Sequence, residues 1–99
     1  MKATAYGPDN INWKYGGKTY SGTTVRQGVI AVDPNVIPLG TRVWVSGYKH
    51  LNLPANGFMA VAEDIGGAIR GNRIDIFINA DAQSVRNFGF QNVQVKILK

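Results

Sequence analysis

Residues 57–78 read GFMAVAEDIGGAIRGNRIDIFI, and this stretch decides the fold. Two short apolar runs, at 57–63 and 73–78, flank a loop that contains the adjacent glycines Gly66 and Gly67. Both runs are rich in β-branched or aromatic residues, which favour β-strands. The stretch therefore predicts two strands joined by a glycine-rich loop.

These two runs have counterparts earlier in the chain. GVIAV at 28–32 resembles GFMAV at 57–61, and GTRVWV at 40–45 resembles GNRIDI at 71–76. The two matches occur in the same order at similar separations. They suggest a duplicated strand-loop-strand unit that closes into a pseudo-twofold barrel.

The rest of the chain fits the same all-β architecture. Twelve Gly and four Pro separate short apolar runs, and no stretch keeps a helical period beyond about two turns. A short helix is expected over 80–88, capped by Asn79 or Asp81 and ended by Gly89. With 99 residues and 44% hydrophobic content, we expect a single domain over 1–99. The six predicted strands are 3–6, 28–32, 42–48, 57–63, 73–78 and 93–98.

Composition excludes several classes of site and partner. The chain has no Cys and a single His, His50, so neither a thiolate nor a histidine metal site is expected. No apolar run reaches about 18 residues, so we expect no membrane insertion, and any export signal or anchor would lie outside this sequence. The net charge of +5 favours anionic partners, but the eleven Lys and Arg are dispersed, which argues against nucleic-acid binding.

Three of the six acidic residues lie within or at the ends of apolar strands: Asp33, Asp64 and Asp75. Each of them could simply cap a turn or pair with an arginine. That explanation suits Asp33 best, because Asp followed by Pro34 at a strand end is a common turn signal. Three such residues together instead predict an acidic cluster.

Asp75 has the surroundings expected of an acid/base catalyst. Alternation along 73–78 places Ile74, Ile76 and Ile78 on one face of the strand and Asp75 on the other face with Phe77. If the isoleucines fill the barrel, Asp75 lines a groove and is partly desolvated. The glycine-rich loop can bring Asp64 beside it, and both effects raise the pKa of Asp75 toward a range useful for catalysis.

Two longer motifs resemble the 3D domain family, which is named for its three aspartates. They are AVDPNVIPLGT at 31–41 and AEDIGGAIRGNRID at 62–75, and TAY at 4–6 also fits. The family comprises the catalytic barrel of membrane-bound lytic transglycosylase A and stationary-phase survival muralytic proteins of Gram-positive bacteria and their phages. The resemblance implies a double-psi β-barrel, here with six strands.

The resemblance also implies an activity, namely cleavage of peptidoglycan glycan strands by a lytic transglycosylase without metal or cofactor. Asp75 would be the catalytic acid, with Asp64 and Asp33 as supporting carboxylates. With this activity we expect a monomer that acts in the cell envelope or outside the cell. A phage association is left open. We assign substrate binding to Tyr6, Gly66, Gly67 and Ala68.

Two alternatives remain open, a non-catalytic wall-glycan binding module and an aspartic-protease-like dyad. Ile65 argues against the dyad, because a hydroxyl residue normally follows a dyad aspartate, and the family itself often has Thr there. The loop 48–57 is longer than is usual in the family, and we expect His50 on it to be solvated. Further candidates for sugar stacking are Trp13, Tyr15 and Tyr20.

Overall fold

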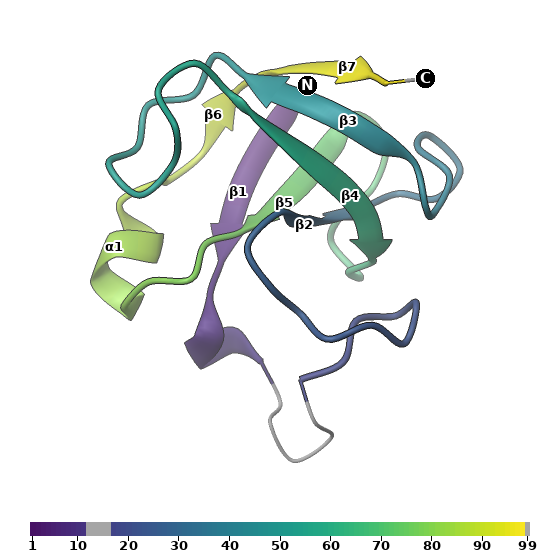
Figure 1. Ribbon diagram of the computed structural model, residues 1–99, viewed down its shortest axis with the longest axis horizontal. Helices are drawn as coiled ribbons and strands as arrows, with labels where there is room; N and C mark the ends of the chain where they lie inside the picture. The colour runs from purple at the N-terminus through teal and green to yellow at the C-terminus, as the bar shows by residue number, and fades with distance from the viewer. Residues whose placement is uncertain (12–16, 99) are drawn as a thin grey trace.

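Seven strands and two short helices make up the described part of the chain, residues 1–11 and 17–98 of a computed structural model (Figure 1). None of these helices is long and apolar enough to cross a membrane. In chain order the elements are β1 (Lys2–Tyr6), the 3-10 helix η1 (Pro8–Asn10), β2 (Val29–Val32), β3 (Arg42–Ser46), β4 (Phe58–Asp64), β5 (Arg73–Phe77), α1 (Ala82–Arg86), β6 (Gln91–Asn92) and β7 (Gln94–Ile97).

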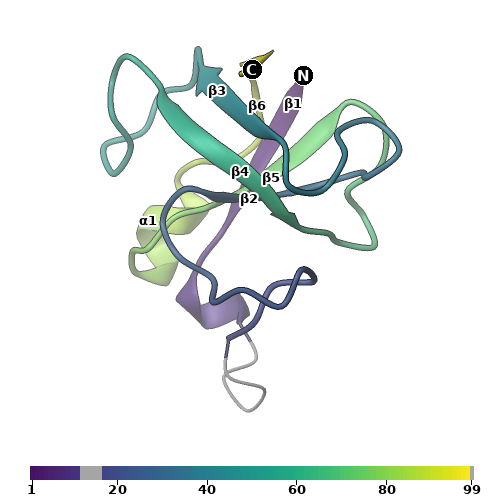
Figure 2. The same cartoon turned by 45° about the vertical axis from the view of Figure 1, so that its right-hand side comes forward.

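The strands form one strongly curved sheet in the order β6-β1-β5-β2-β4-β3-β7. Only Val93 separates the two edge strands along the chain, so the segment 91–97 pairs with β1 at its start and with β3 at its end. This segment nearly closes the sheet into a barrel. In Figure 2, β3 and β4 cross in front of β1 and β5, which form the opposite wall. The all-β prediction is confirmed.

Two details of the prediction are wrong. The described residues contain seven strands rather than six, because β6 is a strand of two residues, too short to show any alternation in sequence. The helix covers Ala82–Arg86 rather than 80–88. Its cap is Asp81, one of the two expected residues, whose carboxylate accepts a hydrogen bond from the Ser84 N–H. The double-psi crossing remains a prediction.

The order of the four central strands agrees with a duplicated unit. The counterparts suggested by sequence are β2 with β4 and β3 with β5. Exchanging each strand with its counterpart turns β5-β2-β4-β3 into β3-β4-β2-β5, which is the same order read from the other edge. The β2·β5 and β3·β4 pairs, which this exchange relates, are both antiparallel. Each antiparallel pair therefore contains one strand from each half, and the two equivalent pairs meet at the parallel β2·β4 contact.

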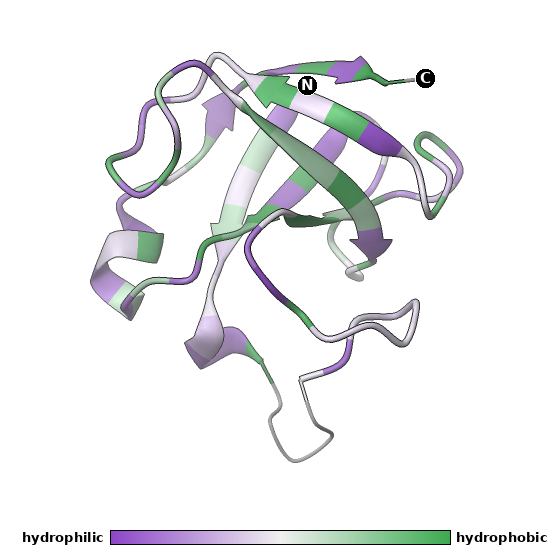
Figure 3. Cartoon of the chain, in the orientation of Figure 1, coloured by the Kyte–Doolittle hydropathy of each residue, from purple (hydrophilic) through white to green (hydrophobic). Residues whose placement is uncertain are grey.

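The main core lies inside the barrel and follows the predicted alternation. Ile74, Ile76 and Ile78 are fully buried together with Ile30, and Figure 3 shows hydrophobic and hydrophilic bands alternating along β5 and β3. A second, smaller cluster lies outside the wall, where the segment 17–28 covers β2 and β5. It contains Val25, Val29 and Phe77, with Tyr6 and Ile11 packed against it.

The long loop 48–57 packs against α1 and takes no part in lining the acidic pocket described below. The His50 Nε2–H donates to the Ser84 carbonyl at 2.6 Å, while its Nδ1 accepts from the Asn52 N–H at 3.1 Å. The imidazole also lies against Phe88, with ring centroids 5.9 Å apart. The expectation of a solvated His50 is therefore wrong.

Gly57 provides a test of the barrel's packing. Its φ is +103°, and a Cβ there would lie 2.5 Å from Trp44 Nε1 and 2.7 Å from the Val45 carbonyl oxygen. Gly40 has a comparable φ of +90° but open space around it. We expect Gly57→Ala to lower the free energy of unfolding by at least about 2 kcal/mol and Gly40→Ala by only about 1 kcal/mol, the cost of a left-handed backbone alone. Equal urea midpoints for the two variants would contradict this packing.

Candidate active site

Two of the predicted acids meet in one row of residues across the outer face of the barrel wall. Thr4 on β1 pairs with Asp75 on β5, Ala31 on β2 pairs with Asp75 on its other side, and Ala31 also pairs with Asp64 on β4. Because adjacent strands lie about 4.8 Å apart, the Cα atoms of the two acids are about 10 Å apart. The small Ala31 side chain leaves open space between the two carboxylates.

A β-bulge places Asp64 in this row. The pairing of β2 with β4 shifts register after Ile30↔Ala62, so that Ala31 lies opposite Asp64 instead of Glu63. Without the shift, alternation would turn Asp64 toward the core with the buried Ala62. Glu63 is bound elsewhere, in a 2.6 Å ion pair with Arg26. The bulge thus delivers the second carboxylate to the site.

Asp75 is partly buried and belongs to a short polar chain. Thr4 Oγ1 donates to Asp75 Oδ1 at 3.1 Å, and Arg73 Nη2 donates to the same Thr4 oxygen at 3.4 Å. Burial raises the pKa of Asp75 to about 6, and the nearby charge of Asp64 adds to the rise. The Thr4 hydrogen bond and the Arg73 charge act in the opposite direction. This confirms the predicted direction and leaves Asp75 able to exchange a proton near neutral pH.

Asp64 is held by three donors. Its Oδ2 accepts from the Tyr6 hydroxyl at 3.2 Å, and its Oδ1 accepts from the backbone N–H groups of Tyr20 and Ile65, both at 3.0 Å. Burial and the charge of Asp64 raise the pKa of Tyr6 far above its ordinary value, so Tyr6 remains a donor. The Tyr6 ring is itself fixed edge-on against Phe77, at a centroid distance of 5.4 Å.

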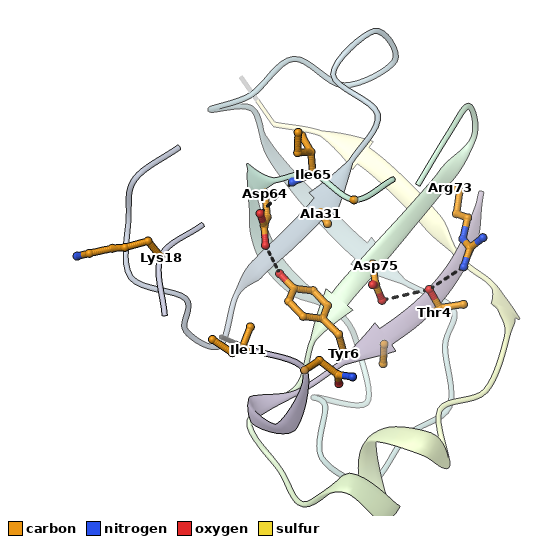
Figure 4. Close-up of a pocket in the computed structure, with 12 residues that line it drawn as sticks. Thr4, Tyr6, Ile11, Lys18, Ala31, Asp64, Ile65, Arg73 and Asp75 are labelled. Carbon is orange, nitrogen blue, oxygen red and sulfur yellow. Dashed lines mark hydrogen bonds between the residues drawn. The ribbon is translucent and has the colours of Figure 1, made fainter. Parts of the chain in front are cut away.

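These groups line an open pocket of about 620 Å³, shown in Figure 4. This volume lies within the range of small-molecule sites. In Figure 4, Asp64 and Tyr6 face each other on one side, and Asp75, Thr4 and Arg73 form the chain of hydrogen bonds on the other. The lining residues used in the argument below are Thr4, Tyr6, Ala31, Asp64, Arg73 and Asp75.

Asp33 does not line this pocket. Its carboxylate accepts hydrogen bonds from the Gly71 N–H at 2.9 Å and the Asn35 N–H at 3.0 Å, and these bonds lower its pKa. Asp33 instead lines a neighbouring pocket of about 170 Å³. It ties the glycine-rich loop to the turn that follows β2, in agreement with the turn role suggested by Pro34.

The predicted substrate-binding residues separate in the same way. Tyr6 and Gly66 line the larger pocket, while Gly67 lines only the smaller one. Ala68 is exposed, and its carbonyl accepts from Arg73 Nη1 at 3.3 Å. Tyr20 contributes its backbone N–H, which donates to Asp64, while the residue itself is exposed. The candidates Trp13 and Tyr15 lie outside the described residues.

The predicted site residues did not include Thr4 and Arg73, which line the same pocket. Alternation does place Arg73 on the same face as Asp75, and this was the one local signal available. Thr4 is part of the TAY motif at 4–6, but its contact with Asp75 could not be foreseen, because it depends on the parallel pairing of two strands 71 residues apart.

The raised pKa of Asp75 predicts a measurable cost in stability. Because the folded-state pKa of about 6 exceeds the ordinary 3.8, the ionised group destabilises the fold, and the penalty grows as pH rises from about 4 to above 6. Asp75→Asn should therefore raise the free energy of unfolding by on the order of 2 kcal/mol at pH 7.5 and change it little at pH 4. The exposed Asp9→Asn is the control, and a gain independent of pH would contradict the prediction.

Among solved structures, the chain is similar to E. coli MltA with bound chitohexaose. The TM-score is 0.70 at 26% identity, covering 83% of this chain and 27% of that one. Another structure of the same protein is described as a unique lytic transglycosylase fold.

Two Bacillus subtilis (strain 168) proteins are similar in sequence. Cell wall-binding protein YocH is 49% identical over 70 residues, which is 71% of this chain and 21% of YocH. The SPbeta prophage-derived uncharacterized protein YorM is 41% identical over 92 residues, 93% of this chain and 32% of YorM. The chain thus spans a fifth to a third of these relatives. The profile of the 3D domain matches residues 28–99, and the chain belongs to the 3D domain family.

Proposed function

We propose that this domain cleaves the glycan strands of peptidoglycan as a lytic transglycosylase, with Asp75 as its single acid/base. One observation carries the proposal. A partly buried carboxyl with a pKa of about 6 lies in an open pocket, between a hydroxyl that orients it and a second carboxylate. A general acid works best when its pKa lies near the working pH.

The reaction needs only one proton carrier. Protonated Asp75 donates to the glycosidic oxygen between N-acetylmuramic acid and N-acetylglucosamine, and the bond from C1 to that oxygen breaks. The C6 hydroxyl of the muramic acid then attacks C1 and gives its proton to the Asp75 carboxylate. The products are a 1,6-anhydromuramic end and a free C4 hydroxyl. Asp75 is again protonated, and no water is consumed.

The neighbouring groups have separate tasks in this scheme. The Asp64 carboxylate, held by Tyr6 and two backbone N–H groups, places negative charge beside the positive charge that develops at C1. Thr4 donates to Asp75 Oδ1 and so leaves Oδ2 to carry the acid proton. Arg73 supports this arrangement, because its guanidinium can only donate and therefore turns the Thr4 hydrogen toward Asp75.

The relatives support a role at the cell wall in more general terms. One is named for cell-wall binding, and the similar solved structures are lytic transglycosylases. We accordingly propose that the chain acts in the cell envelope or outside the cell. The similarity to a prophage-derived protein is compatible with a phage association.

The second candidate function is a non-catalytic module that binds wall glycan, favoured by the name of the relative YocH. An aspartic-protease-like dyad is less well supported. A dyad shares a proton directly between its two carboxyls, whereas the described hydrogen bonds of Asp64 and Asp75 go to Tyr6, to backbone N–H groups and to Thr4.

Mass spectrometry of digested, purified peptidoglycan separates these functions. The wild type and Asp9→Asn should release muropeptides with 1,6-anhydro ends, and Asp75→Asn should release at least about a hundredfold less, because it lacks the acid. Reducing ends in place of anhydro ends would indicate hydrolysis by water. Intact glycan bound equally by all three proteins would indicate the binding module.

The pH profile tests the role of Thr4. With Asp75 as the acid, kcat/KM should fall as pH rises through about 6. Thr4→Val removes a hydrogen bond that lowers the pKa of Asp75, so its alkaline limb should move to higher pH. Thr4→Ser keeps the hydroxyl and should retain the wild-type limb. If the alkaline limbs of the Thr4→Val and Thr4→Ser profiles coincide, Thr4 has no positioning role.

A further inference from the structure

A second surface of the barrel, formed by Arg42, Trp44, Met59 and Lys96, is unusual in composition. We call it the Trp44 surface. Met59 on β4 and Lys96 on β7 lie directly opposite Trp44 on either side of β3, so the three side chains are neighbours across the sheet. Arg42 precedes Trp44 by two residues and shares its face. The alternate residues Val43 and Val45 are fully buried, so this face points outward.

Trp44 is held in place and is still accessible. The position that a Cβ of Gly57 would occupy lies 2.5 Å from Trp44 Nε1 and 2.9 Å from its Cε2, so the indole covers the backbone of this glycine. Trp44 nevertheless remains 39% exposed, and Met59 remains 51% exposed. An aromatic ring supported by backbone and open to solvent is a suitable platform for the apolar face of a sugar.

The surface also carries positive charge that pairs with no carboxylate of the described residues. Both Arg42 and Lys96 are exposed, and the one ion pair within residues 1–11 and 17–98 joins Arg26 to Glu63. Of the two acidic residues of β4, Glu63 is already neutralised by Arg26, and Asp64 is bound within the Asp75 pocket by Tyr6 and two backbone N–H groups. The Trp44 surface therefore favours a ligand that combines sugar rings with negative charge.

This surface is separate from the Asp75 pocket, since none of its four residues lines that pocket. Met59 precedes Asp64 by five residues on the same strand, about 17 Å along β4. In Figure 1, β3 and β7 lie at the top of the barrel, while the segment 17–28 that borders the pocket lies at the bottom. A ligand at the Trp44 surface would leave the pocket free.

We propose that the Trp44 surface is a second glycan-binding site, which holds an anionic peptidoglycan strand while the pocket acts on another part of the wall. A sugar ring stacks on Trp44, and Arg42 and Lys96 pair with carboxylates of the peptide stems. This inference rests on the proposed function for the choice of polymer. The surface itself supports the inference, because its positive charge complements the carboxylates and its exposed indole complements the apolar face of a sugar ring.

The test measures binding without cleavage. In an Asp75→Asn background, purified insoluble peptidoglycan is sedimented with increasing protein, and the dissociation constant is measured from 50 to 300 mM salt. Adding Trp44→Ala should weaken binding about tenfold, and the pair Arg42→Gln and Lys96→Gln should weaken it and flatten its dependence on salt. Leu51→Ala, which removes a fully exposed apolar side chain on the loop 48–57, is the matched control and should bind as the background does.

Three outcomes would overturn the proposal. They are unchanged binding by both surface variants, an equal loss in the Leu51→Ala control, or competition by double-stranded DNA but not by soluble muropeptides. Thermal melting checks that each variant is folded. If Trp44→Ala does not fold, the variant with Arg42→Gln and Lys96→Gln tests the proposal in its place. Failure here is distinct from failure of the proposed function, which would be an absence of anhydro products from the wild type with binding intact.

Discussion

The pairing register of four neighbouring strands is the constraint on which the site depends. It aligns Thr4, Asp75, Ala31 and Asp64 in one row on β1, β5, β2 and β4. The bulge beside Ala31 is essential to this row, because without it Ala31 would lie opposite Glu63 instead of Asp64. The chemistry of the pocket therefore rests on backbone hydrogen bonds far apart in sequence.

The site also imposes a cost on the fold that supports it. Partial burial of Asp75 raises its pKa to about 6, which makes it useful as an acid and unfavourable as a charge. The fully buried isoleucines on the opposite face of β5 offset this cost by packing in the core. One strand thus stabilises the barrel on one face and presents a partly buried, destabilising carboxylate on the other.

The three aspartates for which the family is named do different work in this chain. Asp75 and Asp64 share the pocket, while Asp33 holds the turn after β2 to Gly71 and thereby fixes the glycine-rich loop. A motif of three acids therefore does not imply that all three line one pocket. In our proposal, one aspartate transfers the proton, one supplies charge and one shapes the loop between them.

The sequence by itself determined the features that depend on neighbouring residues. These include the all-β class, the division of β5 into a core face and an Asp75 face, the Asp81 cap, and the family through its motifs. It missed the two-residue β6, the contact of Thr4 with Asp75, the packing of His50 on α1 and the bulge that turns Asp64 outward. The physical reason is the range of the interactions. Alternation and capping act within a few residues, whereas register is decided by hydrogen bonds between strands that meet only in the tertiary structure.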